Sequence, residues 1–272
     1  MGYNGAIMMH DWFNLLRFSV CLLFLSIASV YDIKTREVPN SVWLFFAPLG
    51  LILTLVSLAL DNWKLSLMIT CIISVAIIIG LSLALFYLGL FGGADAKALM
   101  CLAVSMPVYP SIRFIRPIFG SYSQTPSLLL PLSTFNNAVL IASLLVFVII
   151  LKNSMDLARN GMRIFEGLEE ERIMIKILAF ITGFRVEAHK LRAEKHHYII
   201  LEKFDRGENG KIRRHLKVLQ HVSSEGEKSI PREINGKIWV TIGLPFLVFI
   251  TIGFMLAMFV GDIVFWLLNT II

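Results

Sequence analysis

Charged residues are scarce in this sequence of 272 residues. They make up 16% of the chain, whereas soluble domains contain about 25%. Hydrophobic residues make up 57% of the chain and the mean hydropathy is +0.75. This composition excludes an ordinary soluble globular protein, and charge this sparse also excludes an intrinsically disordered chain. It predicts an integral membrane protein with several spans.

Cysteine is also scarce. Cys21, Cys71 and Cys101 all lie in apolar stretches, and no two of them have the spacing of metal ligands. We therefore expect neither a zinc site of CxxC pairs nor a disulfide framework. Five of the six histidines lie in the charged segment, without a metal-ligand spacing on one helix face: His189, His196, His197, His215 and His221. We expect no metal and no other cofactor.

Charge divides the chain into three parts. Residues 1–151 hold 7 Lys/Arg and 5 Asp/Glu, and residues 238–272 hold only Asp262. Residues 152–237 hold 18 Lys/Arg and 13 Asp/Glu, a net charge of +5. We interpret these parts as a membrane core, a charged cytoplasmic domain and a C-terminal transmembrane helix. The basic insert is typical of a soluble face at a membrane surface, and we expect no nucleic-acid partner.

The apolar runs predict about six transmembrane helices, since roughly 20 apolar residues cross a bilayer. The expected spans are 12–31, 41–60, 65–91, 96–112, 134–151 and 238–261. The fourth is short and contains Pro107 and Pro110, so a re-entrant segment is the alternative there. The first run lacks a basic segment followed by a cleavage site, which favours a span over a signal peptide.

Basic residues in short loops orient the spans. Lys34, Arg36 and Lys97 lie in loops 32–40 and 92–97, which share one side with the insert. Because short basic loops stay in the cytoplasm, we expect that side to be cytoplasmic and the N-terminus to lie outside.

The insert has two kinds of pattern. Residues 154–183 carry apolar residues at helical spacing, and the β-prone runs 196–204 and 211–219 flank the turn sequence DRGENG. This predicts a helical part followed by a β-hairpin. The expected fold class is therefore an all-α polytopic membrane protein with a small α+β insert.

Two aspartates stand at the edges of the expected spans. Asp32 ends the first span and Asp95 lies between the third and fourth, so both face the same side at similar depth. An acid at a membrane boundary is a functional hypothesis by default, and a solvated charge at a helix end is the alternative. Gly92 and Gly93, directly before Asp95, let the backbone approach another segment closely and are where we expect any hinge.

The segments around these aspartates resemble the type IV prepilin peptidases and archaeal preflagellin peptidases, which are membrane aspartyl proteases of the GxGD type. The first family pattern, D-x-[KR]-x-x-x-[IV]-P-N, is matched by Asp32, Lys34, Val38, Pro39 and Asn40. The G-x-G-D motif is matched by Gly92-Gly93-Ala94-Asp95, followed by Lys97, with Ala94 in place of the second glycine. The resemblance covers about residues 12–110. The insert and the sixth span are consistent with the archaeal branch.

The resemblance implies catalysis by Asp32 and Asp95. The matched residues around them would support the site: Gly92, Gly93, Ala94, Lys97, Pro39 and Asn40. The implied substrate is a preflagellin or prepilin-like protein, cut after the Gly that ends its basic leader, at the cytoplasmic membrane edge. Two carboxylates can hydrolyse a peptide when one activates water and the other, protonated, acts as the acid.

Several assignments stay open. Lys97 either lowers the pKa of Asp95 or anchors its helix at the headgroups. The cluster Glu169–Glu171 either attracts a basic leader or forms a solvated helix face, and Asp262 is interpreted as a boundary charge on the far side. A proton- or cation-coupled transporter that uses the two aspartates is the main alternative, although no internal repeat is visible. A non-catalytic membrane scaffold is the third hypothesis, and the oligomeric state is not predicted.

Overall fold

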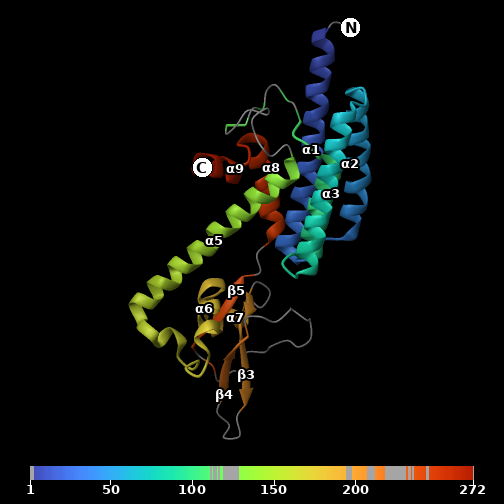
Figure 1. Ribbon diagram of the computed structural model, residues 1–272. Helices are drawn as coiled ribbons and strands as arrows, with labels where there is room; N and C mark the ends of the chain where they lie inside the picture. Colours follow the sequence, from blue (N-terminus) through green and yellow to red (C-terminus); the bar gives the residue numbers. More distant parts are fainter. Residues whose placement is uncertain are drawn as a thin grey trace. The chain divides into compact units, whose positions relative to one another are not determined.

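The structure is a computed structural model of the chain. It describes residues 3–110, 112, 115, 117, 118, 129–193, 198–206, 212–217, 231, 234, 236–242 and 245–271. The chain forms two compact units (Figure 1). The helical unit comprises Met1–Ala142 and Pro245–Ile272, and the inserted unit comprises Ser143–Leu244.

The helices that carry the membrane character are long and apolar. They are α1 (Tyr3–Thr35), α2 (Asn40–Leu60), α3 (Leu65–Tyr87), α4 (Gly93–Ser105), α5 (Leu130–Asn160), α8 (Phe246–Phe259) and α9 (Ile263–Ile271). Among the described residues, four helices are long and apolar enough to cross a membrane, and a fifth span exists if the α8–α9 pair, bent by 61°, counts as one. The protein is thus a mostly helical, multi-pass membrane protein, and the described residues do not confirm six spans.

Among the expected spans, the fourth, at 96–112, differs clearly from the helix that the structure has there, α4. It begins earlier, at Gly93, and has 13 residues, about 20 Å of helix. The helix ends at Ser105 because Pro107 follows Met106, and a residue that precedes proline disfavours the helical conformation. Met106 accordingly has φ −143° and ψ 71°. Asp95 therefore lies inside the first turn of a helix rather than in a loop.

The expected C-terminal helix over 238–272 is wrong at its start. Residues Lys237–Ile242 form strand β5, and α8 begins only at Phe246. Ile238, Trp239 and Val240 are all buried. A fully buried strand of apolar and β-branched residues has the same hydropathy as the beginning of a membrane helix, so the sequence pattern does not separate the two.

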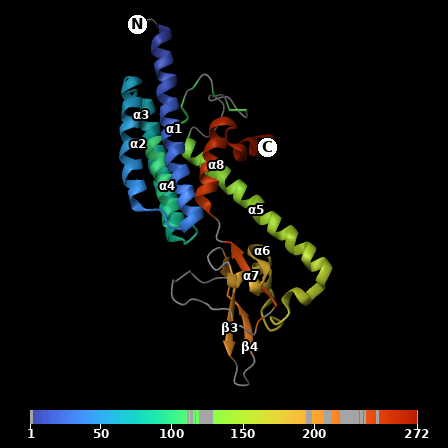
Figure 2. The ribbon, with the colours of Figure 1, turned by 180° about the vertical axis from the view of Figure 1, so that it is seen from behind.

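Short helix α4 is packed inside the helical unit. It lies beside α2 and α3, and α1 packs against α2 and α8 (Figure 2). Gly50 of α2 permits the closest approach, because a Cβ atom there would clash with the Ser105 hydroxyl and lie 2.7 Å from its Cβ atom. Gly253 does the same for α8, where a Cβ atom would lie 2.5 Å from the carbonyl oxygen of Thr134 in α5.

The C-terminal end of α4 is fixed by polar side chains from the three helices around it. Arg17 of α1 donates a 2.8 Å hydrogen bond to the carbonyl oxygen of Ser105, and Thr54 of α2 donates to the same oxygen. Ser74 of α3 donates to the carbonyl oxygen of Pro107. A helix leaves its last carbonyls without intrahelical partners, which is costly away from water. These side chains therefore hold α4 at one depth.

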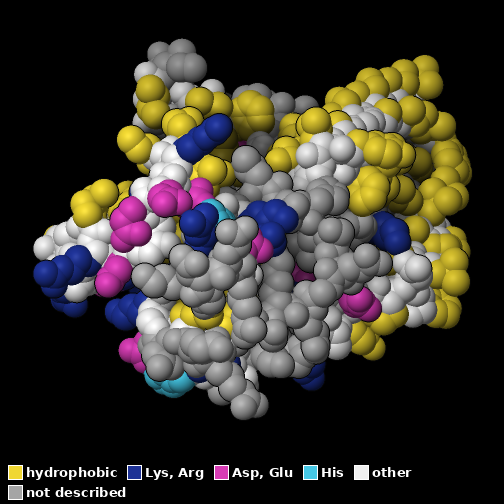
Figure 3. Space-filling view, turned by 90° about the horizontal axis from the view of Figure 1, so that it is seen from below, with side chains coloured by type: hydrophobic (Ala, Val, Ile, Leu, Met, Phe, Trp, Pro, Cys, Tyr) yellow, Lys and Arg dark blue, Asp and Glu magenta, His cyan; other side chains and the backbone are white. Residues whose placement is uncertain are grey.

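The outer surface of the helical unit is apolar. Large hydrophobic side chains are exposed on α2 and α3, among them Leu44, Phe45, Ile72 and Ile73. In Figure 3, hydrophobic side chains cover the part of the molecule where α2 and α3 lie, whereas most of the charged side chains lie elsewhere. A surface of this kind is stable in contact with lipid chains rather than with water.

The inserted unit combines helices with two small sheets. Beyond α5 it contains a 3₁₀ helix, η1 (Gly161–Phe165), α6 (Ile173–Thr182) and α7 (Ala188–Ala193). An antiparallel sheet has the order β1 (Phe184–Glu187), β5, β2 (Tyr198–Ile200), and β3 (Glu202–Arg206) pairs with β4 (Ile212–Leu216). The predicted hairpin is confirmed by β3 and β4. The run 196–204, expected as one strand, instead supplies β2 to the first sheet and β3 to the second.

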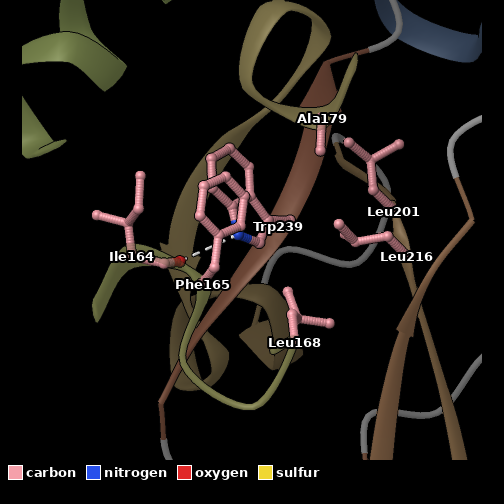
Figure 4. Close-up of a cluster of buried hydrophobic side chains, with 7 residues drawn as sticks. All are labelled: Ile164, Phe165, Leu168, Ala179, Leu201, Leu216 and Trp239. Carbon is pink, nitrogen blue, oxygen red and sulfur yellow. Dashed lines mark hydrogen bonds between the residues drawn. The ribbon is translucent and has the colours of Figure 1, made fainter. Parts of the chain in front are cut away.

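The core of the inserted unit forms around Trp239. Its ring stacks on Phe165 with 5.1 Å between centroids, and its indole N–H donates to the carbonyl oxygen of Ile164 (Figure 4). The buried Glu202 carboxylate accepts two hydrogen bonds from the guanidinium of Arg214 and one from the Trp239 backbone N–H. A buried charge needs such partners. The ion pair lies within the β3–β4 sheet, and the hydrogen bond from Trp239 of β5 joins that sheet to the other.

Candidate functional site

Asp32 lies in the last turn of α1. Its side chain is partly exposed, but the Oδ2 atom is buried and has no hydrogen-bond partner among the described residues. The backbone of Leu247, in the first turn of α8, lies close enough to the carboxyl group to stabilise its negative charge. One turn away, the hydroxyl of Ser29 in α1 pairs with that of Thr251 in α8 at 2.8 Å. Asp32 is therefore held against the N-terminus of α8.

The chain turns sharply after Asp32. The backbone N–H of Arg36 donates to the carbonyl oxygen of Asp32, and Arg36 adopts a left-handed conformation with φ 61°. This closes α1 in the way a glycine commonly does. Pro39 then precedes α2, which begins at Asn40 as the sequence indicates.

Asp95 is the third residue of α4. Its Oδ2 atom accepts a 3.1 Å hydrogen bond from the backbone N–H of Gly92, the residue before the helix. This contact satisfies one of the free N–H groups near the helix start and places the carboxylate at the positive end of the helix dipole. A Cβ atom on Gly92 would lie 3.1 Å from Asp95 Oδ2. Gly92 therefore leaves the room that the carboxylate occupies.

Burial raises the pKa of Asp95 to about 6. The hydrogen bond from Gly92 opposes this rise, and the negative charge of Asp32 adds to it. A carboxylate is stabilised by a donor and destabilised by desolvation and by a like charge. The two aspartates, 63 positions apart in the sequence, thus interact electrostatically across the N-terminal ends of α4 and α8.

The remaining predicted residues lie on both sides of this pair. Lys97 donates a 2.8 Å hydrogen bond to the Oδ1 atom of Asn40, and its charge is not among the causes of the Asp95 pKa shift. Of the two roles expected for Lys97, the structure thus gives no support to a lowering of the Asp95 pKa.

The two glycines before Asp95 have ordinary surroundings. Gly92 has φ −71°, which any residue adopts, and a Cβ atom on Gly93 would be 3.7 Å from Phe86. Ala94 is partly exposed.

Two contributions were not evident from the sequence. The first is the N-terminus of α8, because Leu247 lies more than 200 positions after Asp32. The second is an aromatic cluster in which Phe91, just before Gly92, packs its ring 4.9 Å from Phe246 and 5.9 Å from Phe135. Phe246 begins α8, so this cluster joins the turn before Asp95 to the helix that contacts Asp32. The sequence signal for the start of this helix was Pro245, which stands directly before an apolar run.

Asp262 lies away from the pair. It caps α9 by accepting from the backbone N–H of Phe265, and its other oxygen accepts from the Asn136 amide. It follows the opposite end of α8 from Leu247, and Leu247 and Phe259 are about 18 Å apart along that helix. His215 contacts Glu171 and His189 contacts Glu187, whereas His196, His197 and His221 lie outside the described residues. Within the described ranges, no three His, Cys, Asp or Glu side chains gather as a metal site would require.

The comparisons with known proteins cover almost the whole chain. The model of the type IV leader peptidase family matches residues 19–151, which include both aspartates, and the model for the archaeal peptidase A24 C-terminus type II matches residues 175–263. The preflagellin peptidases of Methanococcus voltae and Methanococcus maripaludis are each 27% identical to the chain over 252 residues, 91% of this chain and 96% of theirs. That of Methanocaldococcus jannaschii is 26% identical over 91% of this chain and 95% of its own.

Proposed function

Because the chain belongs to the type IV leader peptidase family, we propose that it is a membrane aspartyl endopeptidase whose catalytic residues are Asp32 and Asp95. Its substrate is a preflagellin or prepilin-like protein, and the names of the relatives specify preflagellin. The scissile bond follows the Gly that ends the basic leader. The observation that carries this proposal is the electrostatic interaction of two partly buried carboxylates at adjoining helix ends.

The chemistry needs one proton shared by two carboxylates. The ionised aspartate takes a proton from a water molecule, whose oxygen attacks the scissile carbonyl carbon. The protonated aspartate donates its proton to the carbonyl oxygen. As the C–N bond breaks, the aspartate that took the proton from water passes it to the leaving amine, and a hydroxyl of the tetrahedral intermediate returns a proton to the other aspartate. Burial, and to a smaller extent the charge of Asp32, raise the pKa of Asp95 to about 6, so the singly protonated state persists to about pH 6, well above the range of an ordinary aspartate.

The surrounding residues position the pair. Gly92 leaves room for the Asp95 carboxylate, and Lys97 links α4 to Asn40. Pro39 directly precedes α2, and Gly93 and Ala94 are the first two residues of α4. The Oδ2 atom of Asp32 is buried and has no hydrogen-bond partner among the described residues, so it can accept from the attacking water once the site opens to admit it. A substrate helix lies among the lipid-facing helices while its leader stays in water.

The side of the membrane follows from the short basic loops. We assign loops 32–40 and 92–97 and the inserted unit to the cytoplasm, with the N-terminus outside. A preflagellin made in the cytoplasm then presents its leader at the membrane edge where the two aspartates lie.

The test is cleavage by the purified full chain in detergent. A preflagellin with a basic leader ending in Gly is incubated with the wild type, Asp32→Asn and Asp95→Asn, and the products are identified by mass. We expect one cut after the Gly in the wild type and at least a roughly 1000-fold loss in each variant, since each removes an acid–base group. Asp262→Asn is the matched control, because it changes a buried acid at the other end of α8.

Two results contradict the proposal. Near-normal turnover in either aspartate variant excludes the pair as the catalytic groups. A cut at another position excludes the Gly specificity. Uptake of an ion into proteoliposomes that is lost in both variants, without any cleavage by the wild type, supports the transporter instead.

A further inference from the structure

Helix α6 of the inserted unit presents an apolar face to the outside. Ile173 is 74% exposed, Met174 77%, Ile177 49% and Ile181 36%. These positions fall within about 100° of the helix circumference, so they form one continuous stripe. We call this set the α6 stripe. Its exposure in a small unit rich in charged residues needs an explanation, since contiguous apolar surface commonly marks an interaction site.

The stripe belongs to a firmly packed helix. Ala179, on another side of α6, is fully buried in the cluster around Trp239 (Figure 4), and Ile175 and Phe180 pack against the same cluster. Because the inward side already fills the core, the outward isoleucines have no place inside the unit.

Contacts with α5 set the level of α6. The Asn153 amide of α5 donates hydrogen bonds of 2.7 Å to the carbonyl oxygen of Phe180 and 2.6 Å to that of Gly183. Residues 117–151 hold no charge, and Lys152 is the first charged residue after them. The part of α5 from Leu130 to Leu151 is about 33 Å long, close to the roughly 30 Å hydrocarbon thickness of a bilayer. Asn153 thus ties the end of α6 to the part of α5 that directly follows this uncharged stretch.

The nearest charges are compatible with a lipid surface. Arg172 precedes α6 and is exposed. The Glu169 carboxylate accepts from the Gly167 backbone N–H, and that of Glu171 accepts from the Leu216 backbone N–H. Two of the three acids before α6 are therefore engaged within the inserted unit, and the apolar residues dominate the outward face.

We propose that α6 is an interfacial helix whose stripe lies in the boundary between the lipid headgroups and the acyl chains. A short helix with one apolar face binds a membrane surface in this way. Docking fixes the inserted unit at the membrane surface. The unit is also connected covalently to the helical unit, through α5 and through the segment before α8. The proposal is independent of the peptidase assignment.

The test places a fluorophore on the stripe of the full chain in phosphatidylcholine proteoliposomes. Ile177→Cys is labelled with bimane, and Lys203→Cys on β3 is the matched control because the Lys203 side chain is also 49% exposed. The native Cys21, Cys71 and Cys101 are buried, and unmutated protein measures their background labelling. Quenching is read with nitroxide-labelled lipid and with aqueous iodide.

We expect nitroxide lipid to quench bimane at position 177 at least threefold more than at position 203, and iodide to quench it at least threefold less. Met174→Cys, on the same face, gives the same pattern. Equal lipid quenching at positions 177 and 203 overturns the proposal. Protection of position 177 from both quenchers, together with disulfide cross-linking of two unlabelled Ile177→Cys chains through the introduced thiols, also overturns it and assigns the stripe to a second copy of this chain.

Discussion

The ammonium group of Lys97 donates a 2.8 Å hydrogen bond to the side-chain carbonyl oxygen of Asn40. Lys97 lies two residues after Asp95 in α4, and Asn40 begins α2, eight positions after Asp32. The contact therefore ties together the two segments that carry the aspartates. We expect it to act on the positions of these segments, since burial, the Gly92 hydrogen bond and the Asp32 charge are the causes that set the pKa of Asp95.

Removal of this hydrogen bond should weaken catalysis moderately. We predict that Lys97→Met and Asn40→Leu each lower kcat/KM about fivefold, since an exposed hydrogen bond of this kind contributes about 1 kcal/mol. The double variant should lose no more than either single variant, because both remove the same contact. Cleavage kinetics at saturating and limiting substrate measure these effects.

The controls for Lys97 separate position from charge. Asn40→Asp keeps an acceptor for the ammonium and should retain most of the activity, and Lys64→Met, in the turn before α3, should have no effect. The pH profile of the Lys97→Met variant should match the wild type. A displaced profile means that Lys97 acts on the ionisation of the aspartates, contrary to this prediction.

The approach of α2 to α4 at Gly50 sets a second prediction. Gly50→Ala should destabilise the helical unit by about 1 to 3 kcal/mol, because the added methyl group overlaps the Ser105 side chain. It should also lower turnover, since α4 carries Asp95. Thermal unfolding in detergent and cleavage rates measure both effects.

Two companion variants check the cause. Gly80→Ala, in α3, adds the same methyl group where nothing lies within 4 Å, so it should be no less stable than the wild type. Ser105→Gly in the Gly50→Ala background should restore part of the lost stability. A Gly50→Ala protein with unchanged stability shows that the two helices are farther apart than described.

The raised pKa of Asp95 predicts how stability depends on pH. The folded-state pKa is about 6, above the value of about 3.9 in an unfolded chain. Folding therefore favours the protonated form of Asp95. The stability that goes with this form is fully present below about pH 4 and is lost as the pH rises through 6. The loss amounts to about 3 kcal/mol. Thermal unfolding in detergent between pH 4 and pH 8 should show this fall.

Asp95→Asn should remove that fall, and at pH 8 the variant should be at least as stable as the wild type. The Asn side chain still accepts from Gly92, so the helix start is preserved. Asp205→Asn is the control, because Lys203 holds the pKa of the exposed Asp205 below its ordinary value and the fall should persist there. A wild type that is equally stable at pH 5 and pH 8 contradicts the prediction.

Local patterns predicted the parts of the site that depend on neighbouring residues. Positions at span edges and the two motifs around them made Asp32 and Asp95 the candidates, Pro39 placed the start of α2, and the hairpin of β3 and β4 followed from its turn sequence. Hydropathy did not distinguish the buried strand β5 from a membrane helix. It also did not show that α4 ends at Ser105.

The sequence by itself determined the membrane class and the charged insert and marked Asp32 and Asp95 as candidates, because composition and short motifs act within a few turns of chain. Only the tertiary structure decided that Asp32 meets the N-terminus of α8 at Leu247, and that Lys97 meets Asn40. It alone decided that Ile173 and Ile177 of α6 face outward. Contacts between distant segments depend on which helix faces pack together, and hydrophobic periodicity shows that a face is apolar without showing whether protein or lipid covers it.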